Sequence, residues 1–416
     1  MTADGHVEPP GSTTGVHRRV PNADKIRPSF LGLIAGCGLT MGFTAALTAP
    51  LAIELGASEF AAGVSVSSLT MIVLIADIFG TRALPYLEPR RSIVFGMAMW
   101  GIGSIATTFS PTFALLEASR LVQGVGVCVF AAAGSGLALR LAQQAHFGKA
   151  LGEFHSAQIF GSMTAPIFGG GVVALWPGEP GLRIAFFICG LLAFACAIAA
   201  HLLLPSLPTG VKPRLSKPYM PGLGRPRSLA VVSTAAVGQG MRGTIVLTVV
   251  PLLAATTMSM TTFTVGVFLF ATYSIETLVG RNAGALSDRI GRRPIVLIGA
   301  VAGIIGVAML LIAHHHSDQV LFCLTTIPFG FSGGILIGVL PTTVVDMAAQ
   351  PEVGVAGMRL SRDLGFSVMP VMVGAMLTAS GTVPALTFCG VIFVVVIAAT
   401  LGVGETSKVH REGLAV

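Results

Sequence analysis

The chain has 416 residues, of which 53% are hydrophobic and only 10% are charged. Soluble domains carry roughly 25% charged residues, so this composition excludes an ordinary soluble enzyme or binding domain. The net charge of +7 does not indicate nucleic-acid binding, because the basic residues punctuate long apolar runs and form no patch. Such runs predict helices that cross a membrane, each about 20 residues long.

Twelve apolar stretches follow one another and predict an all-α membrane protein. The expected spans are 30–53, 60–81, 92–109, 112–138, 150–175, 183–204, 229–254, 261–283, 294–313, 319–344, 355–379 and 383–403. The longest break, 205–228, is rich in proline and basic residues and predicts a cytoplasmic linker between two six-helix bundles, 29–204 and 229–404. Residues 1–28 are expected to be a disordered cytoplasmic tail, and 405–416 a second cytoplasmic tail.

Lysine and arginine residues predict the orientation, because they accumulate in the cytoplasmic segments of membrane proteins. If the N-terminus is cytoplasmic, every Lys and Arg except three lies in an inside segment. The exceptions are Arg120, Arg183 and Arg242. We therefore expect a multi-pass protein of the cell (plasma or inner) membrane, with both termini in the cytoplasm.

Glycines and prolines recur at a constant offset of 204 residues. The recurring pairs are Gly80 with Gly284, Gly161 with Gly365, Pro166 with Pro370 and Gly170 with Gly374. One offset shared by separate helices predicts duplicated, pseudo-symmetric halves. Such halves usually rock about a central site, which gives alternating access.

The sharpest motif lies between the eighth and ninth spans. Its fixed positions are Gly284, Asp288, Arg289, Gly291, Arg292, Arg293 and Pro294. This pattern resembles the loop signature GxxxDRxGRRP of the major facilitator superfamily, in which the loop acts as a conformational latch. The resemblance implies the fold of that family, two six-helix bundles. The first-half counterpart, 80–91, departs from the pattern because Leu84 replaces the acid.

Each position of this predicted gating loop has a physical role. Gly284 would let two helix ends approach closely. Asp288 would accept hydrogen bonds from the N-terminus of a neighbouring helix. The three arginines would hold the loop inside and pair with anionic lipid.

The fourth span carries ionisable side chains that the membrane makes costly. Arg120, Gln123 and the glycines after them resemble the RxxQGxG motif of the same family, whose arginine is often tied to proton coupling. Glu117 lies three residues before Arg120, so one helical face can hold both. Asp77, one turn before Gly80, is a further proton-coupling candidate at the inner gate.

The fifth span resembles the antiporter signature GxxxGPxxGG of proton-coupled drug exporters. Its positions are Gly161, Ala165, Pro166, Gly169 and Gly170, with Ala165 where a second glycine is usual. Glycine and proline make a bendable helix with a smooth face that packs closely. This helix favours export over uptake.

Arg242 lies near the middle of the seventh span, beside Gln239. A mid-membrane arginine is costly unless it faces a wet cavity or an acidic partner. Glu276 in the eighth span is the nearest candidate partner, with Tyr273 beside it. We expect Arg242, Gln239, Tyr273 and Gln123 to line the substrate cavity, and Glu276 to join Glu117, Arg120 and Asp77 as a coupling candidate.

These features predict a secondary active transporter and not an enzyme. The favoured hypothesis is proton-coupled efflux of small apolar or amphipathic compounds, with the small molecule, protons and membrane lipids as partners. An uptake symporter for a small organic anion, anchored by Arg242, is an alternative, and a non-transporting membrane sensor is a third. No nucleotide-binding loop of the GxxxxGK[ST] type occurs, so an ion gradient is the expected energy source. We expect no metal site, no cofactor, no nucleic-acid partner and function as a monomer.

Overall fold

The computed structural model describes residues 23–79, 88–141, 147–206, 226–347 and 351–407, and every regular element in these ranges is a helix. The first-half helices are α1 (Ala23–Phe43), α2 (Thr48–Glu54), α3 (Glu59–Phe79), α4 (Pro89–Thr108), α5 (Phe113–Leu141), α6 (Phe147–Leu175) and α7 (Glu179–Leu203). The second-half helices are α8 (Pro226–Thr244), the π-helix η4 (Ile245–Val249), α9 (Val250–Thr256), α10 (Thr262–Ile290), α11 (Arg292–His316), α12 (Gln319–Leu324), α13 (Thr326–Met347), α14 (Pro351–Ser380) and α15 (Thr382–Val403).

The predicted all-α membrane fold is confirmed. In the described ranges, ten helical segments are long and apolar enough to cross a membrane. The helices α3 and α4 fall short of that measure but occupy the second and third expected spans. The twelve expected spans therefore each correspond to one helix or to one run of consecutive helices.

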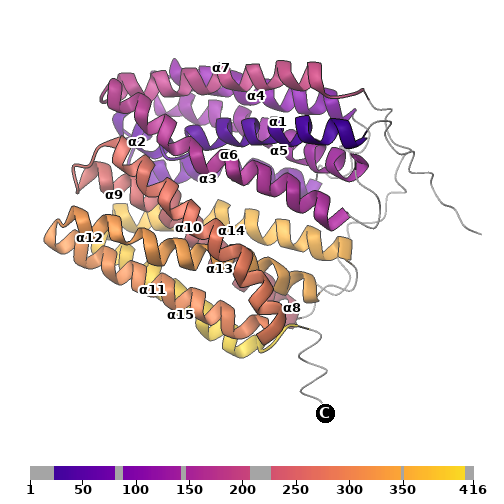
Figure 1. Ribbon diagram of the computed structural model, residues 1–416. Coiled ribbons are helices and arrows are strands. Elements are labelled where there is room, and N and C mark those ends of the chain that lie inside the picture. Colours follow the sequence, from indigo (N-terminus) through magenta and orange to yellow (C-terminus); the bar gives the residue numbers. More distant parts are fainter. Residues whose placement is uncertain (1–22, 80–87, 142–146, 207–225, 348–350, 408–416) are drawn as a thin grey trace, which may run out of the picture.

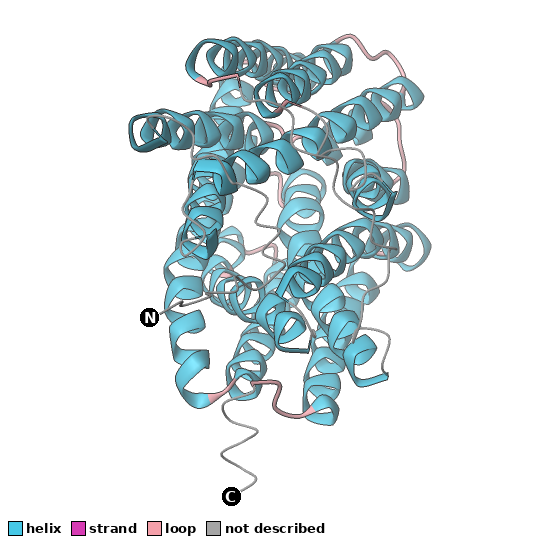
Figure 2. Cartoon of the chain, turned by 90° about the vertical axis from the view of Figure 1, so that its right-hand side faces the viewer, coloured by secondary structure: helices cyan, strands magenta, loops and turns pink. Residues whose placement is uncertain are grey.

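The helices form two bundles that lie side by side (Figure 1). Each bundle has its own core of buried side chains, one formed by the first half and the other almost entirely by the second. Buried aromatic side chains include Phe30, Phe130, Phe154 and Phe186 in the first core and Phe268, Phe322, Phe329 and Phe393 in the second. We call the end where α8 begins and α15 ends the inner end; Figure 2 views the molecule from that side.

Two helix boundaries differ from the sequence prediction. Helix α1 begins at Ala23, inside the expected disordered tail, whose earlier residues lie outside the described ranges. Helices α10 and α11 are separated by Gly291 alone. Gly291 has φ +98°, which a side chain would strain. The predicted gating loop is therefore helix on both sides of one glycine.

The first helical segment of each half is interrupted at an equivalent place. Residues 44–47 form a turn between α1 and α2, and η4 separates α8 from α9. Pro251 explains the second interruption, because its ring excludes the carbonyl group four residues earlier and it has no N–H to donate. The wider turns of a π-helix accommodate this mismatch, and such bulges often mark functional sites.

The two bundles meet along two seams, α6 against α10 and α14 against α3. At the first seam, a Cβ atom on Gly266 would lie 2.4 Å from the carbonyl oxygen of Pro166. At the second, a Cβ atom on Gly63 would lie 2.4 Å from the carbonyl oxygen of Pro370. The recurring prolines thus occupy matching positions in the two seams, as the duplicated sequence pattern predicts.

The seams extend to the outer end, where α3 and α10 begin. A Cβ atom on Gly170 would lie 2.7 Å from the carbonyl oxygen of Thr262. A Cβ atom on Gly374 would lie 2.9 Å from the carbonyl oxygen of Glu59. At such distances any side chain at these two positions would force the backbone to shift. Glycine therefore allows the two bundles to pack closely here.

Candidate functional site

A buried ion pair joins α8 and α10 in the second bundle. Arg242 Nη2 donates to Glu276 Oε2, and the two side chains are only 6% and 13% exposed. The guanidinium also lies over the ring of Tyr273, with Cζ 5.0 Å from the ring centroid, which is within cation–π range. The acidic partner that the sequence offered for Arg242 is thus in place, as expected for a charge that must be paired inside a membrane.

Gly333 of α13 makes room for this pair. A Cβ atom at Gly333 would lie 2.7 Å from Glu276 Oε2 and 3.1 Å from Arg242 Nε. Sequence reasoning missed this residue, although its place in a glycine-rich stretch of an apolar span was a signal for close helix packing. Three helices therefore build the site: α8 supplies the cation, α10 the acid and the aromatic ring, and α13 the space.

The pair is not fully satisfied. Arg242 Nε and the hydroxyl of Ser332 are buried and have no hydrogen-bond partner among the described residues. Unpaired buried polar groups are costly and call for an explanation. An unpaired N–H donor and an acid therefore lie together at this position, which is an arrangement able to bind a polar group of a ligand.

Gln239 does not join this ion pair in the described hydrogen bonds. Its side chain is fully buried, and Nε2 donates to the carbonyl oxygen of Ala235 in the same helix, at 3.1 Å. The role of Gln239 as a cavity residue stays a prediction. Arg242 lies three residues before η4, where the backbone hydrogen bonds of this span change from the α-helical to the π-helical pattern.

The first bundle buries Arg120 in a different way. Its Nη1 donates to Gln123 Oε1 at 2.5 Å, and its Nε donates to the carbonyl oxygen of Ser65 in α3 at 3.4 Å. Gln123 Nε2 in turn donates to the hydroxyl of Ser104 in α4 at 3.1 Å. The guanidinium is thus held by neutral oxygen atoms, and Gln123 belongs to this network.

Glu117 lies near Arg120 but forms no ion pair with it within 4 Å. Its Oε1 is buried without a hydrogen-bond partner among the described residues. Glu117 and Arg120 can therefore share one helical face, as expected, but they are not paired directly. Asp77 belongs to α3, but its side chain lies outside the described part of the chain, as do residues 80–87 of the first-half loop.

The gating segment is built around Arg292. Its guanidinium contacts Asp288 Oδ1 at 2.5 Å and Asp346 Oδ2 of α13 at 3.2 Å. Arg289 is exposed in the last turn of α10, and the side chain of Arg293 extends from the first turn of α11. No described atom lies within 4 Å of a Cβ position on Gly284, so the expected close approach of helix ends does not occur there.

The residue that caps α11 is Glu405, and not Asp288 as predicted. Its carboxylate accepts from the backbone N–H groups of Arg292 and Arg293 at 3.0 and 3.1 Å, and from those of Thr406 and Ser407 at 2.9 Å each. Burial alone would raise the pKa of Glu405, but these four donors lower it below its ordinary value. An acid just after the last apolar span was the signal that sequence reasoning passed over.

The antiporter-type helix α6 uses two faces. Gly161 and Gly169 pack on α1, where Cβ atoms would lie 1.9 and 2.2 Å from the carbonyl oxygens of Ala35 and Phe43. Ala165 is fully buried between them. Pro166 and Gly170 face α10 across the seam. One face therefore holds the first bundle together, and the other joins the two bundles.

Comparison with known proteins agrees with this architecture. The family model described as Major Facilitator Superfamily matches residues 29–370. The structure resembles that of a bacterial homologue of the human lysosomal transporter Spinster, in an inward-facing and unoccupied conformation. The TM-score is 0.75 at 12% sequence identity, over 92% of this chain and 97% of the other.

Curated relatives include several transport proteins. The inner membrane transport protein YdhP of Escherichia coli K12 is 25% identical over 232 residues, which are 55% of this chain and 57% of YdhP. The multidrug resistance protein Stp of Mycobacterium tuberculosis is 26% identical over 85% of this chain and 76% of Stp. The purine ribonucleoside efflux pump NepI of Salmonella typhimurium is 27% identical over 44% of this chain and 46% of NepI.

Proposed function

Because this chain belongs to the major facilitator superfamily, we propose that it is a proton-coupled exporter of small apolar or amphipathic compounds. The observation that carries the proposal is the buried contact between Arg242 and Glu276. A carboxylate that gains a proton loses the charge that neutralises the buried cation beside it. Proton uptake at Glu276 is therefore an event with structural consequences.

Arg242 is placed to transmit that event. A protonated Glu276 no longer neutralises the guanidinium, whose burial then becomes unfavourable. Arg242 lies on α8 three residues before η4, where the helix is already irregular. Movement of the guanidinium toward a wetter position would tilt α8 relative to α9. A proton thus favours one of the two conformations through its different affinity for each.

Closure at the outer end supports alternating access. Both seams are tight where α3 and α10 begin, because Gly170 and Gly374 lie against the backbone of the opposite bundle. We propose that this is the conformation closed to the outside, with both termini in the cytoplasm. Opening would separate the bundles at these glycines while the bundle cores move as units.

Export is favoured over anion uptake by the same ion pair. An organic anion anchored by Arg242 would have to displace Glu276, which already neutralises this cation. The names of two relatives, a multidrug resistance protein and a purine ribonucleoside efflux pump, also point outward. We infer for this chain an outward direction of transport and a cargo of small uncharged or amphipathic compounds.

Inside-out membrane vesicles test the proposal. A proton gradient, acidic inside, is imposed by dilution without ATP, and the uptake of ethidium and of radiolabelled inosine is followed as two separate probes. The expected result is accumulation of at least one probe that stops when nigericin collapses the gradient. Vesicles without the protein are the control. Accumulation that persists after the collapse would contradict proton coupling.

A further inference from the structure

A groove with a volume of about 620 Å³ lies between α8 and α15 in the inner half of the second bundle. Its walls are largely apolar, with Val237 on α8 and Val395, Val396 and Ala399 on α15. Figure 1 shows α15 on the side of this bundle that is turned away from the first bundle. Val395 is 47% exposed, so the groove opens on the surface that faces lipid.

The groove has the length of one lipid leaflet. Arg227 lies at its inner mouth and Val237 at its deep end, ten residues apart on one helix. Ten residues of α-helix rise about 15 Å, which is half of a hydrocarbon core about 30 Å thick. The groove therefore suits an acyl chain that enters from the cytoplasmic leaflet.

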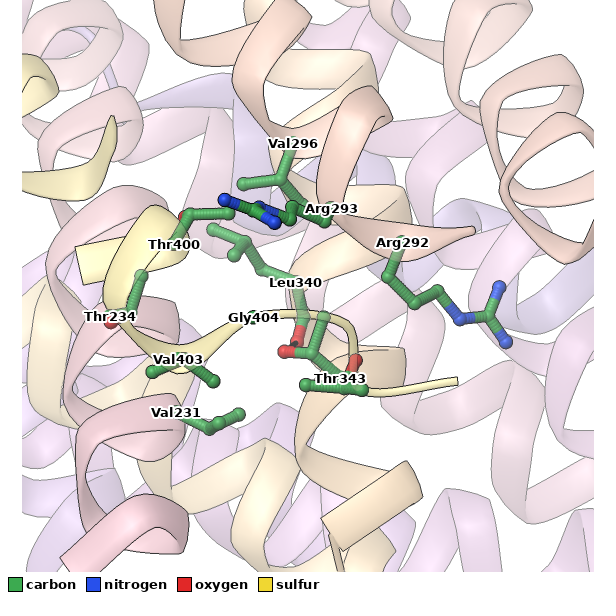
Figure 3. Close-up of a pocket in the computed structure, with 11 residues that line it drawn as sticks. Val231, Thr234, Arg292, Arg293, Val296, Leu340, Thr343, Thr400, Val403 and Gly404 are labelled. Atoms are coloured by element: carbon green, nitrogen blue, oxygen red, sulfur yellow. Dashed lines mark hydrogen bonds between the residues drawn. The ribbon is translucent and has the colours of Figure 1, made fainter. Parts of the chain in front are cut away.

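A small, mostly apolar pocket of about 20 Å³ continues the groove at the inner end (Figure 3). The two share Thr234 and Val403 as lining residues. In Figure 3 the side chain of Arg293 reaches toward Thr400, whereas Arg292 points away to the other side. Thr406 also lines this pocket; it is 3% exposed, and its hydroxyl has no hydrogen-bond partner among the described residues.

The charges at this end leave two cations without an acidic partner. Arg227 donates to the carbonyl oxygen of Glu405 at 2.9 Å, and Arg293 to that of Leu401 at 3.5 Å. No carboxylate of a described residue lies within 4 Å of either guanidinium. A guanidinium has five N–H donors, so capping the end of α15 in this way leaves most of them available.

The nearby acids are already engaged. Asp288 and Asp346 contact Arg292, and the carboxylate of Glu405 is held by the backbone N–H groups that cap α11. Arg227 and Arg293 are therefore the arginines at this end without a carboxylate contact among the described residues, and Arg227 lies at the inner mouth of the apolar groove. Basic pockets between spanning helices on the cytoplasmic side are sites for anionic lipid headgroups.

From this juxtaposition we infer that the groove binds one anionic phospholipid of the cytoplasmic leaflet. An acyl chain occupies the apolar groove, and Arg227 and Arg293 donate to the phosphate at its inner mouth. The bound lipid joins the start of α8 to the start of α11 and the end of α15. It stabilises the inner end of the second bundle.

Lipid titration with native mass spectrometry tests the inference on the full-length protein in detergent. Phosphatidylglycerol and phosphatidylcholine are the two probes. The wild-type protein should retain one phosphatidylglycerol in preference to phosphatidylcholine. The double variant R227Q/R293Q should bind phosphatidylglycerol about 30-fold more weakly, because each arginine near an anionic lipid surface contributes a factor of about five.

Variants with matched controls locate the site. Ala399→Phe should block the groove and weaken phosphatidylglycerol binding without any change of charge. Ala195→Phe adds the same bulk at an exposed position on α7, and Arg90→Gln removes a cation from the first turn of α4. Both controls should bind like the wild type.

Three outcomes would overturn the inference. Equal affinity for the two lipids would exclude a headgroup site, and normal binding by Ala399→Phe would exclude the groove. Weakening by Arg90→Gln equal to that of the double variant would show a general surface-charge effect. If the double variant does not fold, Ala399→Phe and the single variant Arg227→Gln carry the test.

Discussion

Both bundles bury an arginine in the membrane, but they stabilise it by different means. Arg120 of the first bundle donates to the side-chain oxygen of Gln123 and a backbone carbonyl oxygen, all of them neutral. Arg242 of the second bundle contacts the carboxylate of Glu276 directly. Glu117 of the first bundle forms no ion pair with Arg120 among the described residues, and its Oε1 is buried without a hydrogen-bond partner there.

This difference separates a structural site from a switch. A proton added to Glu117 breaks no ion pair, so the hydrogen bonds of Arg120 persist. A proton added to Glu276 removes the partner of a buried cation, and the surrounding helices must respond. The second bundle is therefore where we place proton coupling, although the sequence motifs indicate Arg120 more clearly.

The largest expected effect comes from removal of Glu276. Glu276→Gln leaves Arg242 charged and unpaired, because arginine does not lose its proton in proteins. Loss of one partner of a buried pair costs roughly 3–5 kcal/mol of unfolding free energy. Arg242→Gln should cost less, because the remaining carboxyl group can become neutral by binding a proton. Thermal unfolding in detergent measures both variants.

The double variant R242Q/E276Q and the first-bundle variant E117Q complete this test. The double variant should recover most of the lost stability, since no lone charge remains. Glu117→Gln should cost less than about 1 kcal/mol, as no ion pair is broken. A loss for Glu117→Gln equal to that for Glu276→Gln would erase the proposed difference between the bundles.

Two glycines offer the next largest effect. Gly333→Ala would place a Cβ atom 2.7 Å from Glu276 Oε2, and Gly103→Ala would place one 2.6 Å from Gln123 Cγ. Overpacking of this kind costs about 1–3 kcal/mol. Both variants should lose stability, but only Gly333→Ala should also reduce transport driven by a proton gradient. Gly136→Ala is the control, because no described atom lies within 4 Å of its Cβ position.

The seams are where the two halves should behave alike. Gly170→Ala and Gly374→Ala each add a methyl group against the backbone of the opposite bundle. Both should favour opening at the outer end, measured as faster labelling of a cysteine introduced at the outer end of α10. Gly171→Ala is a neighbouring control with open space. An effect in one seam only would contradict the proposed symmetry of the motion.

The smallest effect concerns Glu405. Its pKa is lowered in the folded protein, so its ionised form stabilises the fold above the unfolded pKa of about 4.3. That contribution disappears as the pH falls through the lower folded value. Glu405→Gln should therefore lose about 1 kcal/mol at neutral pH, as expected for loss of a helix cap. The difference from wild type should vanish in strong acid; a difference independent of pH would contradict the charged cap.

The matching position in the first bundle, 204 residues earlier, is His201. Its ring nitrogens lie 3.2 Å from Arg90 Nη2 in the first turn of α4. The carboxylate of Glu405 caps α11 in the second bundle, whereas the imidazole of His201 contacts Arg90 of α4 in the first bundle. The inner ends of the two bundles therefore differ in chemistry.

Hydropathy was enough to predict the helices, because spanning segments must be apolar and internally hydrogen-bonded. Pairing of Arg242 with Glu276 was also predictable, since a lone charge in the membrane requires a partner. The break at η4 was not predicted. Its visible signal, Pro251, does not distinguish a kink from a π-turn.

Other features depend on contacts between distant segments. Glu405 caps a helix that begins 113 residues earlier in the chain, and no local pattern specifies that contact. Gly333 was hidden among many glycines, because only the packing of α10 against α13 shows which of them makes room for an ion pair. The spacing of Glu117 and Arg120 predicts a shared helical face, but it does not show which groups bind the arginine. Arg120 donates instead to the carbonyl oxygen of Ser65 and to Oε1 of Gln123.

The central claim is that Glu276 couples transport to protons. Its most direct test compares Glu276→Gln with Glu117→Gln in inside-out vesicles, using whichever of ethidium and inosine the wild-type protein transports. Glu276→Gln should lose gradient-driven accumulation but keep probe movement down its own concentration gradient, whereas Glu117→Gln should keep both. Accumulation by Glu276→Gln at the wild-type level would contradict the claim.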